Sequence, residues 1–143
     1  MNYLAGAAVS ADADNISGFT AGAGGDVIGV DISAFAAGIL AANAGTLVNV
    51  AGSADNQIIV DAADTGYANF LAAEAAVNAV TAATDDYLLM FRNTTTGVVE
   101  LYADADSSVA GSEVLIASFT DITVVNSAVF LAGIVAANFD ITI

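Results

Sequence analysis

Apolar residues in this chain come in many short runs and in no long one. The longest uninterrupted apolar runs are about ten residues, such as AVFLAGIVAA at residues 128–137. A helix that spans a membrane needs roughly 20 such residues. Although hydrophobic residues make up 57% of the sequence, we therefore expect short strands and helices around a core, and no membrane insertion. A chain of this length suits one core, so residues 1–143 are expected to form a single domain.

The balance of charge is strongly acidic. There are 16 Asp and Glu residues against one basic side chain, Arg92, and the chain has no Lys, His or Cys. A formal net charge of −15 argues against nucleic-acid partners, because phosphate recognition needs Lys and Arg. The missing residue types exclude disulfides, thiolate and imidazole metal sites and most catalytic triads. No nucleophile is placed beside a base, so we expect no enzyme. The carboxylates instead favour Ca²⁺, which prefers hard oxygen ligands.

The spacing of apolar residues predicts an α+β fold. The most regular helical spacing lies in residues 67–83, and we predict the main helix there. Residues 86–92 and 98–103 flank NTTTG, which is typical of a β-hairpin turn. Further strands are expected over 26–32, 46–50, 57–60, 113–119, 122–125 and 135–143, and short helices over 34–42 and after Ser127. The prediction is a β-rich domain with an antiparallel sheet in its C-terminal half and the main helix packed on that sheet.

Glycines and aspartates are concentrated near the start of the chain, in NISGFTAGAGGDVIGVDIS at residues 15–33. The stretch does not fit the nucleotide-binding pattern GxGxxG, and acidic residues beside a phosphate would repel it. One interpretation is a calcium site, because Gly allows tight turns and Asp supplies oxygen ligands. The other is a turn that only connects strands, since Gly and Asp are ordinary turn residues. The candidate ligands around this stretch are Asp12, Asp14, Asp26 and Asp31.

A second acidic stretch is LYADADSSVAGSEVLIASF. Asp104, Asp106 and Ser108 have the spacing D-x-D-x-S that opens a calcium loop, and Glu113 lies five residues further on. An EF-hand would need Glu at loop position 12, where this chain has Leu115, so the stretch is not an EF-hand. A hairpin loop with these carboxylates could still bind Ca²⁺ between strands. The alternative is an acidic, solvated hairpin.

Glu74 and Arg92 are candidates for a structural ion pair. Glu74 lies close to the apolar stripe of the predicted helix, and Arg92 follows an apolar strand. A pair between them would let the helix dock on the sheet without an unpaired buried charge. The alternative is that both side chains extend their charged ends to solvent.

Three stretches of the chain follow one another in a recognisable order. They are DNISGFTAGAGGDVIGVDISAF, then NTTTGVVELYADADSS with EVLIASFTDIT, and the terminal NFDITI. Together they resemble the C-terminal regions of hemolysin-type calcium-binding (RTX-related) bacterial proteins. The resemblance implies calcium binding and export by type I secretion. It also implies an uncleaved C-terminal secretion signal made of Asn138, Phe139, Asp140, Ile141, Thr142 and Ile143.

We expect from these features an extracellular or cell-surface structural subunit that assembles with copies of itself into a filament or surface layer. Ca²⁺ would screen the repulsion between acidic subunits, and the type I secretion machinery would be a partner during export. The apolar residues 1–11 would insert into a neighbouring subunit. Two alternatives stay open: a secretion and calcium-folding domain of a larger protein, and an adhesin-like module for glycans or ice.

Overall fold

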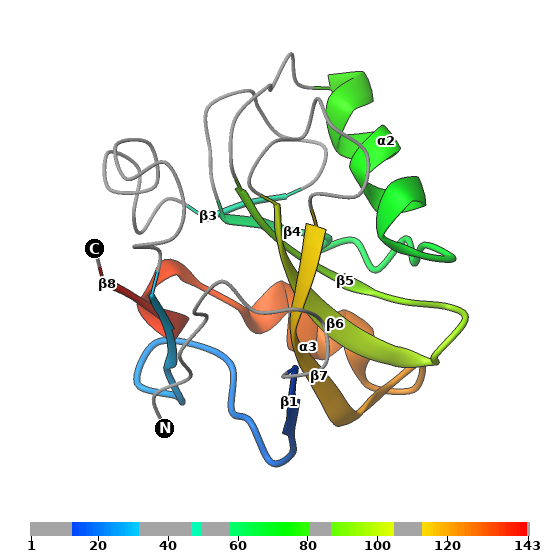
Figure 1. The fold of residues 1–143 in the computed structure, drawn as a ribbon. Coiled ribbons are helices and arrows are strands. Elements are labelled where there is room, and N and C mark those ends of the chain that lie inside the picture. The colour runs from blue at the N-terminus through cyan, green and yellow to red at the C-terminus, as the bar shows by residue number, and fades with distance from the viewer. Residues whose placement is uncertain (1–12, 32–46, 50–57, 81–86, 105–112, 143) are drawn as a thin grey trace.

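A six-stranded sheet forms the centre of this computed structural model (Figure 1), which describes residues 13–31, 47–49, 58–80, 87–104 and 113–142. The strand order is β1-β7-β6-β5-β4-β3, and β2 and β8 form a second, two-stranded sheet. The α+β class with a β-rich core is thereby confirmed. In chain order the elements are β1 (Asp14–Ile16), β2 (Ile28–Asp31), β3 (Leu47–Asn49), β4 (Ile58–Val60), α2 (Phe70–Val80), β5 (Tyr87–Arg92), β6 (Val98–Asp104), β7 (Glu113–Thr123), α3 (Ser127–Gly133), the 3₁₀ turn η2 (Ala136–Asn138) and β8 (Phe139–Thr142).

The large sheet is mixed. Its strands β5, β6 and β7 pair antiparallel. Three strands add in parallel: β1 to β7, β4 to β5, and β3 to β4. The small sheet pairs β2 with β8 in parallel, so residues 28–31 lie beside the end of the described chain. The sheets therefore depend on contacts between residues that are distant in sequence.

The hairpin predicted at NTTTG is confirmed between β5 and β6. The Asn93 side-chain oxygen accepts hydrogen bonds from the backbone N–H groups of Thr95 and Thr96, at 2.9 and 3.3 Å. Gly97 closes the turn with a φ of 81°, in the left-handed region that residues with a Cβ rarely adopt. Asn and Gly thus act at the positions where the turn requires them.

Helix α2 starts later than the periodicity predicts. Tyr67 pairs with Asn93 as an isolated bridge, which keeps it out of the helix. The Asn69 side-chain oxygen accepts a hydrogen bond from the N–H of Ala72 at 3.0 Å, so Asn69 caps the first turn. The predicted residues 81–83 lie outside the described part of the chain. Neither α2 nor α3, the two α-helices in the described ranges, is long and apolar enough to cross a membrane.

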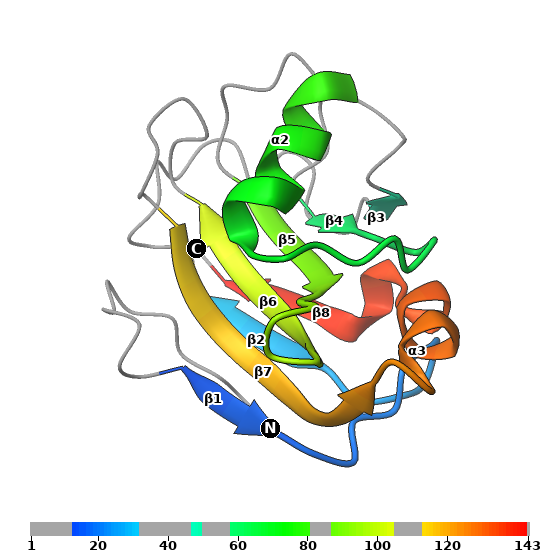
Figure 2. The ribbon, with the colours of Figure 1, turned by 90° about the vertical axis from the view of Figure 1, so that its right-hand side faces the viewer.

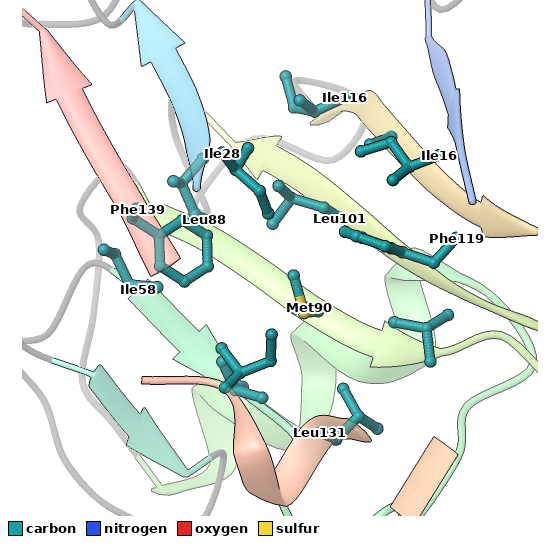
Figure 3. Packing of buried hydrophobic residues seen from close by; sticks show 14 of the residues in the cluster. Ile16, Ile28, Ile58, Leu88, Met90, Leu101, Ile116, Phe119, Leu131 and Phe139 are labelled. Carbon is teal, nitrogen blue, oxygen red and sulfur yellow. The ribbon is translucent and has the colours of Figure 1, made fainter. Parts of the chain in front are cut away.

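The large sheet is covered on both faces. Along β5, Leu89 and Phe91 face α2, whereas Leu88 and Met90 face the opposite side, as expected from the alternation of a strand. Figure 2 shows α2 on one side of the sheet and the β2–β8 pair on the other. Figure 3 shows the hydrophobic core on the β2–β8 side of the large sheet, where side chains from the sheet, β2, β8 and α3 pack together. Its labelled members are Ile16, Ile28, Ile58, Leu88, Met90, Leu101, Ile116, Phe119, Leu131 and Phe139.

Candidate functional site

A group of ionisable side chains lies between α2 and one end of the sheet. Tyr87 of β5 stands directly opposite Asp104 of β6, and Asp104 stands directly opposite Glu113 of β7. Opposed residues of antiparallel strands point to the same face, so these three form a row across the sheet. Glu74 of α2 lies above this row and is hydrogen-bonded to the Asp104 side chain. We call Glu74, Tyr87, Asp104 and Glu113 the acidic row.

Three members of the acidic row are buried, and Glu113 is half-buried. Asp104 is fully buried and Glu74 is only 8% exposed. Burial raises the pKa of Glu74 to about 7, helped by the hydrogen bond with Asp104 and by the charges of Asp104 and Glu113. Burial likewise raises the pKa of Tyr87, and the charges of Asp104, Glu74 and Glu113 raise it further.

The Tyr87 hydroxyl is the second unusual feature of the row. Tyr87 is 2% exposed, and among the described residues its hydroxyl oxygen has no hydrogen-bond partner. A buried hydroxyl without a partner costs roughly 1–3 kcal/mol. The hydroxyl is close enough to all three carboxyl groups to feel their charge.

The structure describes two of the four candidate ligands in the second predicted calcium stretch. Asp104 and Glu113 come together across β6 and β7, whereas Asp106 and Ser108 lie outside the described residues. In the ranges that the structure describes, no three acidic side chains converge as a ready-made metal site. Sequence reasoning missed Glu74 and Tyr87 as members of this group, because strand register and helix docking bring them in from elsewhere in the chain.

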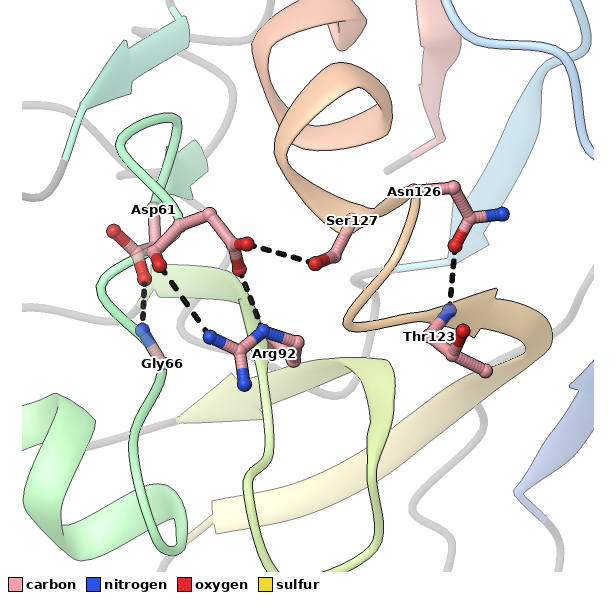
Figure 4. A network of polar contacts seen from close by, with 7 residues as sticks. Asp61, Gly66, Arg92, Thr123, Asn126 and Ser127 are labelled. Carbon is pink, nitrogen blue, oxygen red and sulfur yellow. Dashed lines mark hydrogen bonds and ion pairs between the residues drawn. The ribbon is translucent and has the colours of Figure 1, made fainter.

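The predicted Glu74–Arg92 pair is wrong. The Arg92 Nε donates instead to the Asp64 carboxylate at 2.8 Å (Figure 4). Arg92 ends β5, whereas Glu74 lies near Tyr87 at the start of that strand, and five residues of strand span roughly 16 Å. Asp64 also accepts a hydrogen bond from the Ser127 hydroxyl at 2.8 Å, so it ties β5 to α3.

The turn that carries Asp64 explains this pairing. Asp64 itself has a φ of 51°, and Gly66 has a φ of 72°. The Gly66 N–H donates to the Asp61 carboxylate at 3.1 Å, which closes the loop between β4 and α2. A Cβ on Gly66 would lie 2.6 Å from the Arg92 guanidinium. The sequence DAADTG has the composition of a turn, but it does not reveal that Asp64 pairs with Arg92.

The glycine-rich stretch near the start is held as a turn. The Asn138 side chain donates to the carbonyl oxygens of Gly22 and Asp26, at 3.2 and 2.8 Å. Its oxygen accepts from the N–H groups of Gly22 and Val135, at 3.0 Å each. The Asp26 carboxylate accepts from the N–H of Thr20 at 2.8 Å, so it also shapes this turn.

The other predicted ligands of this stretch lie apart from that turn. Asp14 starts β1 opposite Ala117, and Asp31 ends β2 opposite Thr142. Asp12 lies outside the described residues.

The predicted secretion signal coincides with structured chain. Asn138 is fully buried, Phe139 belongs to the core and Asp140 is exposed. The backbone of Ile141 and Thr142 continues β8, and Ile143 lies outside the described residues. The tie between Asn138 and Gly22 joins residues 116 apart, which no local pattern signals.

Helix α3 has an apolar outer surface. Its buried side carries Phe130 and Leu131, as expected for a core helix. Its exposed side carries Ala128, Val129 and Ala132, with no polar residue among them. In the preceding turn, Val124 and Val125 are 65% and 88% exposed, and Val129 is 81% exposed. We call Val124, Val125, Ala128, Val129 and Ala132 the α3 patch.

Comparisons with known proteins found no matching family model, no similar curated protein and no similar solved structure. The function is therefore inferred from the residues of this chain.

In a buffer without divalent cations, we expect the free energy of unfolding to fall as the pH rises from about 5 to about 8. Glu74 ionises near its ordinary value of 4.5 in the unfolded chain, but its pKa is about 7 in the folded protein. The folded state therefore holds the extra proton between these values, and this stabilisation is lost as the pH rises through the folded pKa. Urea unfolding at several pH values measures the effect.

The variant Glu74→Gln is the control for this pH dependence. It keeps the shape and the hydrogen bonding of the protonated side chain, so its stability should change much less over the same range. The chain has no His to titrate there. An equal fall in the wild type and in Glu74→Gln would contradict the assignment.

Proposed function

We propose that this protein is an extracellular, self-assembling structural subunit of a filament or surface layer, stabilised by Ca²⁺ and exported by type I secretion. The proposed partners are further copies of the same chain. No catalytic role is part of the proposal. In this proposal the structural framework of the subunit is the antiparallel part of the sheet, β5 to β7, against which α2 and α3 pack.

The α3 patch is the observation that carries this proposal. A helix that is apolar on all sides is normally buried. Helix α3 has the sequence SAVFLAG, yet the side that carries Val129 faces outward. It lies at an outer edge of the molecule in Figure 2. Several exposed apolar side chains on one helix and the turn before it are typical of protein interaction sites.

The distribution of charge favours a second copy as the partner. The segment from Ile122 to Phe139 contains no charged residue, in a chain whose net charge is −15. Two copies that meet through this segment bring together a stretch of chain that has no charged residue of its own. A cationic partner would instead be drawn to the acidic surfaces elsewhere. Ca²⁺ and salt would reduce the remaining repulsion between acidic subunits.

The substitution Val129→Asp is expected to weaken self-association by about tenfold or more, because it places a charge at the centre of an apolar contact. Val129 lies in the first turn of α3, where a carboxylate is compatible with the helix dipole, so the fold should be retained. Sedimentation velocity over a concentration series in Ca²⁺ measures the effect.

Leu71→Asp is the matched control for this experiment. Leu71 is an exposed apolar residue in the first turn of α2, and the change adds the same charge. This variant should associate like the wild type. Association of Val129→Asp at wild-type strength would exclude the α3 patch as the contact. A variant without residues 1–10 then tests the other proposed route, insertion of the N-terminal segment.

A further inference from the structure

The exposed side of α3 combines small side chains with a larger one. Ala128 and Ala132 lie one helical turn apart, and Val129 stands beside them. Two alanines one turn apart leave room for a larger side chain of a neighbouring helix, and helices pack when side chains of one fill such spaces in the other. The same face of a second copy offers that space to Val129 and offers its own Val129 in return. The α3 patch is therefore complementary in shape to itself.

The turn before α3 presents the rest of the patch in a fixed form. Val124 and Val125 are 65% and 88% exposed there. The Asn126 side chain accepts a hydrogen bond from the Thr123 N–H at 2.7 Å and donates one to the Asp121 carbonyl oxygen at 3.0 Å (Figure 4 draws the first of these). Because these bonds already order the turn, a partner can contact the two valines at a small cost in conformational entropy.

The distribution of charge favours the same surface on the partner. The nearest charged residues along the chain are Asp121 and Asp140, which flank the uncharged residues 122–139. The Asp121 carboxylate accepts a hydrogen bond from the Gly18 N–H at 2.7 Å. An acidic surface that covered the valines would have to lose the hydration of its carboxylates, which is unfavourable. A second α3 patch has no carboxylate to dehydrate.

The outer face of α2 is the competing surface within the described chain. Its exposed residues between Phe70 and Val80 also carry no charge. That face is less apolar, because it includes Asn78 and its largest apolar side chain, Leu71, is only 48% exposed. Contact between α3 of one copy and α2 of the next would also be head-to-tail, which leaves a free surface at each end.

We propose that two copies pair through their α3 patches about a twofold axis, and that this pair is the unit that assembles further. The inference rests on the proposed self-assembly and specifies its first contact. A twofold contact is closed, because each α3 patch is fully used in one pair. Growth of a filament or layer then needs a second, different contact. Since the α3 patch contains no carboxylate, the pair forms without Ca²⁺, which acts on the later step.

Charge exchange at Val129 tests the pair, with the full chain in EDTA and about 0.15 M NaCl, where screening acts over about 8 Å. In sedimentation velocity up to about 1 mM protein, the wild type should reach a limit at twice the mass of one chain. Val129→Asp and Val129→Arg should each pair about tenfold more weakly or worse, because the twofold axis brings like charges together. Their equimolar mixture should pair at least tenfold more tightly than either variant alone.

The matched control mixes Val129→Asp with the double variant Val129→Asp/Leu71→Arg. It keeps a basic side chain on an acidic protein but moves it to the exposed face of α2. This mixture should not pair, and urea unfolding confirms that each variant is folded.

Two results would overturn the twofold pair. The first is a wild type that pairs while the mixture of Val129→Asp and Val129→Arg does not, which indicates a head-to-tail contact; weaker pairing of Leu71→Asp would then place it on α2. The second is a wild type that stays monomeric in EDTA at every concentration, including one that instead binds phosphatidylcholine vesicles. Polymers in Ca²⁺ with no pair in EDTA would overturn the pair alone. Pairs in EDTA with no polymers in Ca²⁺ would support the pair and contradict the proposed function.

Discussion

Replacing Asn138 with alanine is expected to lower the free energy of unfolding by roughly 3 kcal/mol. Asn138 is fully buried, and its side chain satisfies backbone groups of Gly22, Asp26 and Val135 through four hydrogen bonds. Alanine removes the partner of the Gly22 and Val135 N–H groups and of the Asp26 carbonyl oxygen, whereas the Gly22 carbonyl oxygen keeps its hydrogen bond from the Gly25 N–H. These bonds hold the glycine-rich turn against the end of the chain, so their loss should also loosen the β2–β8 sheet. Urea unfolding at neutral pH measures the change.

Asn138→Asp separates hydrogen bonding from side-chain size. It keeps the acceptor for Gly22 and Val135, but it faces the carbonyl oxygens of Gly22 and Asp26 with a carboxylate. We expect a loss at least as large as that of Asn138→Ala. Asn78→Ala, on the exposed side of α2, should have little effect. A loss below about 1 kcal/mol for both Asn138 variants would show that the four bonds do not hold the turn.

Replacing Phe119 with alanine is expected to cost roughly 3–5 kcal/mol of unfolding free energy. Phe119 is fully buried on β7 and contacts the rings of Phe19 and Phe130, with centroids 5.5 and 5.2 Å away. The three rings join the glycine-rich stretch, the sheet and α3. Truncation therefore removes apolar burial and leaves a cavity at the junction of three segments.

Phe119→Leu should cost clearly less than Phe119→Ala, because it fills most of the space. Leu71→Ala, at a half-exposed position on α2, is the control for apolar truncation outside the core. A stability of Phe119→Ala within about 1 kcal/mol of the wild type would contradict the assigned packing.

Local patterns predicted the elements whose structure depends on neighbouring residues. The helical spacing of residues 67–83 located α2, although the cap at Asn69 and the bridge at Tyr67 move its start to Phe70. NTTTG located a hairpin because Asn and Gly satisfy its turn from within. The α+β class follows from these short periodic segments.

Contacts between distant residues could not be predicted in the same way. The parallel pairing of β2 with β8 and the Asn138 tie depend on the three-dimensional path of the chain, not on spacing. Arg92 had sixteen possible acidic partners, and the position of the β4–α2 loop selects Asp64. Charge composition did indicate that acids would matter, but only strand register places Asp104 beside Tyr87 and Glu113.

Electron microscopy of the wild-type protein, with Ca²⁺ and after addition of EDTA, tests self-assembly most directly. The proposed function predicts regular filaments or sheets in Ca²⁺ that dissociate when EDTA removes the ion. A protein that stays a monodisperse monomer in Ca²⁺ at high concentration would contradict it.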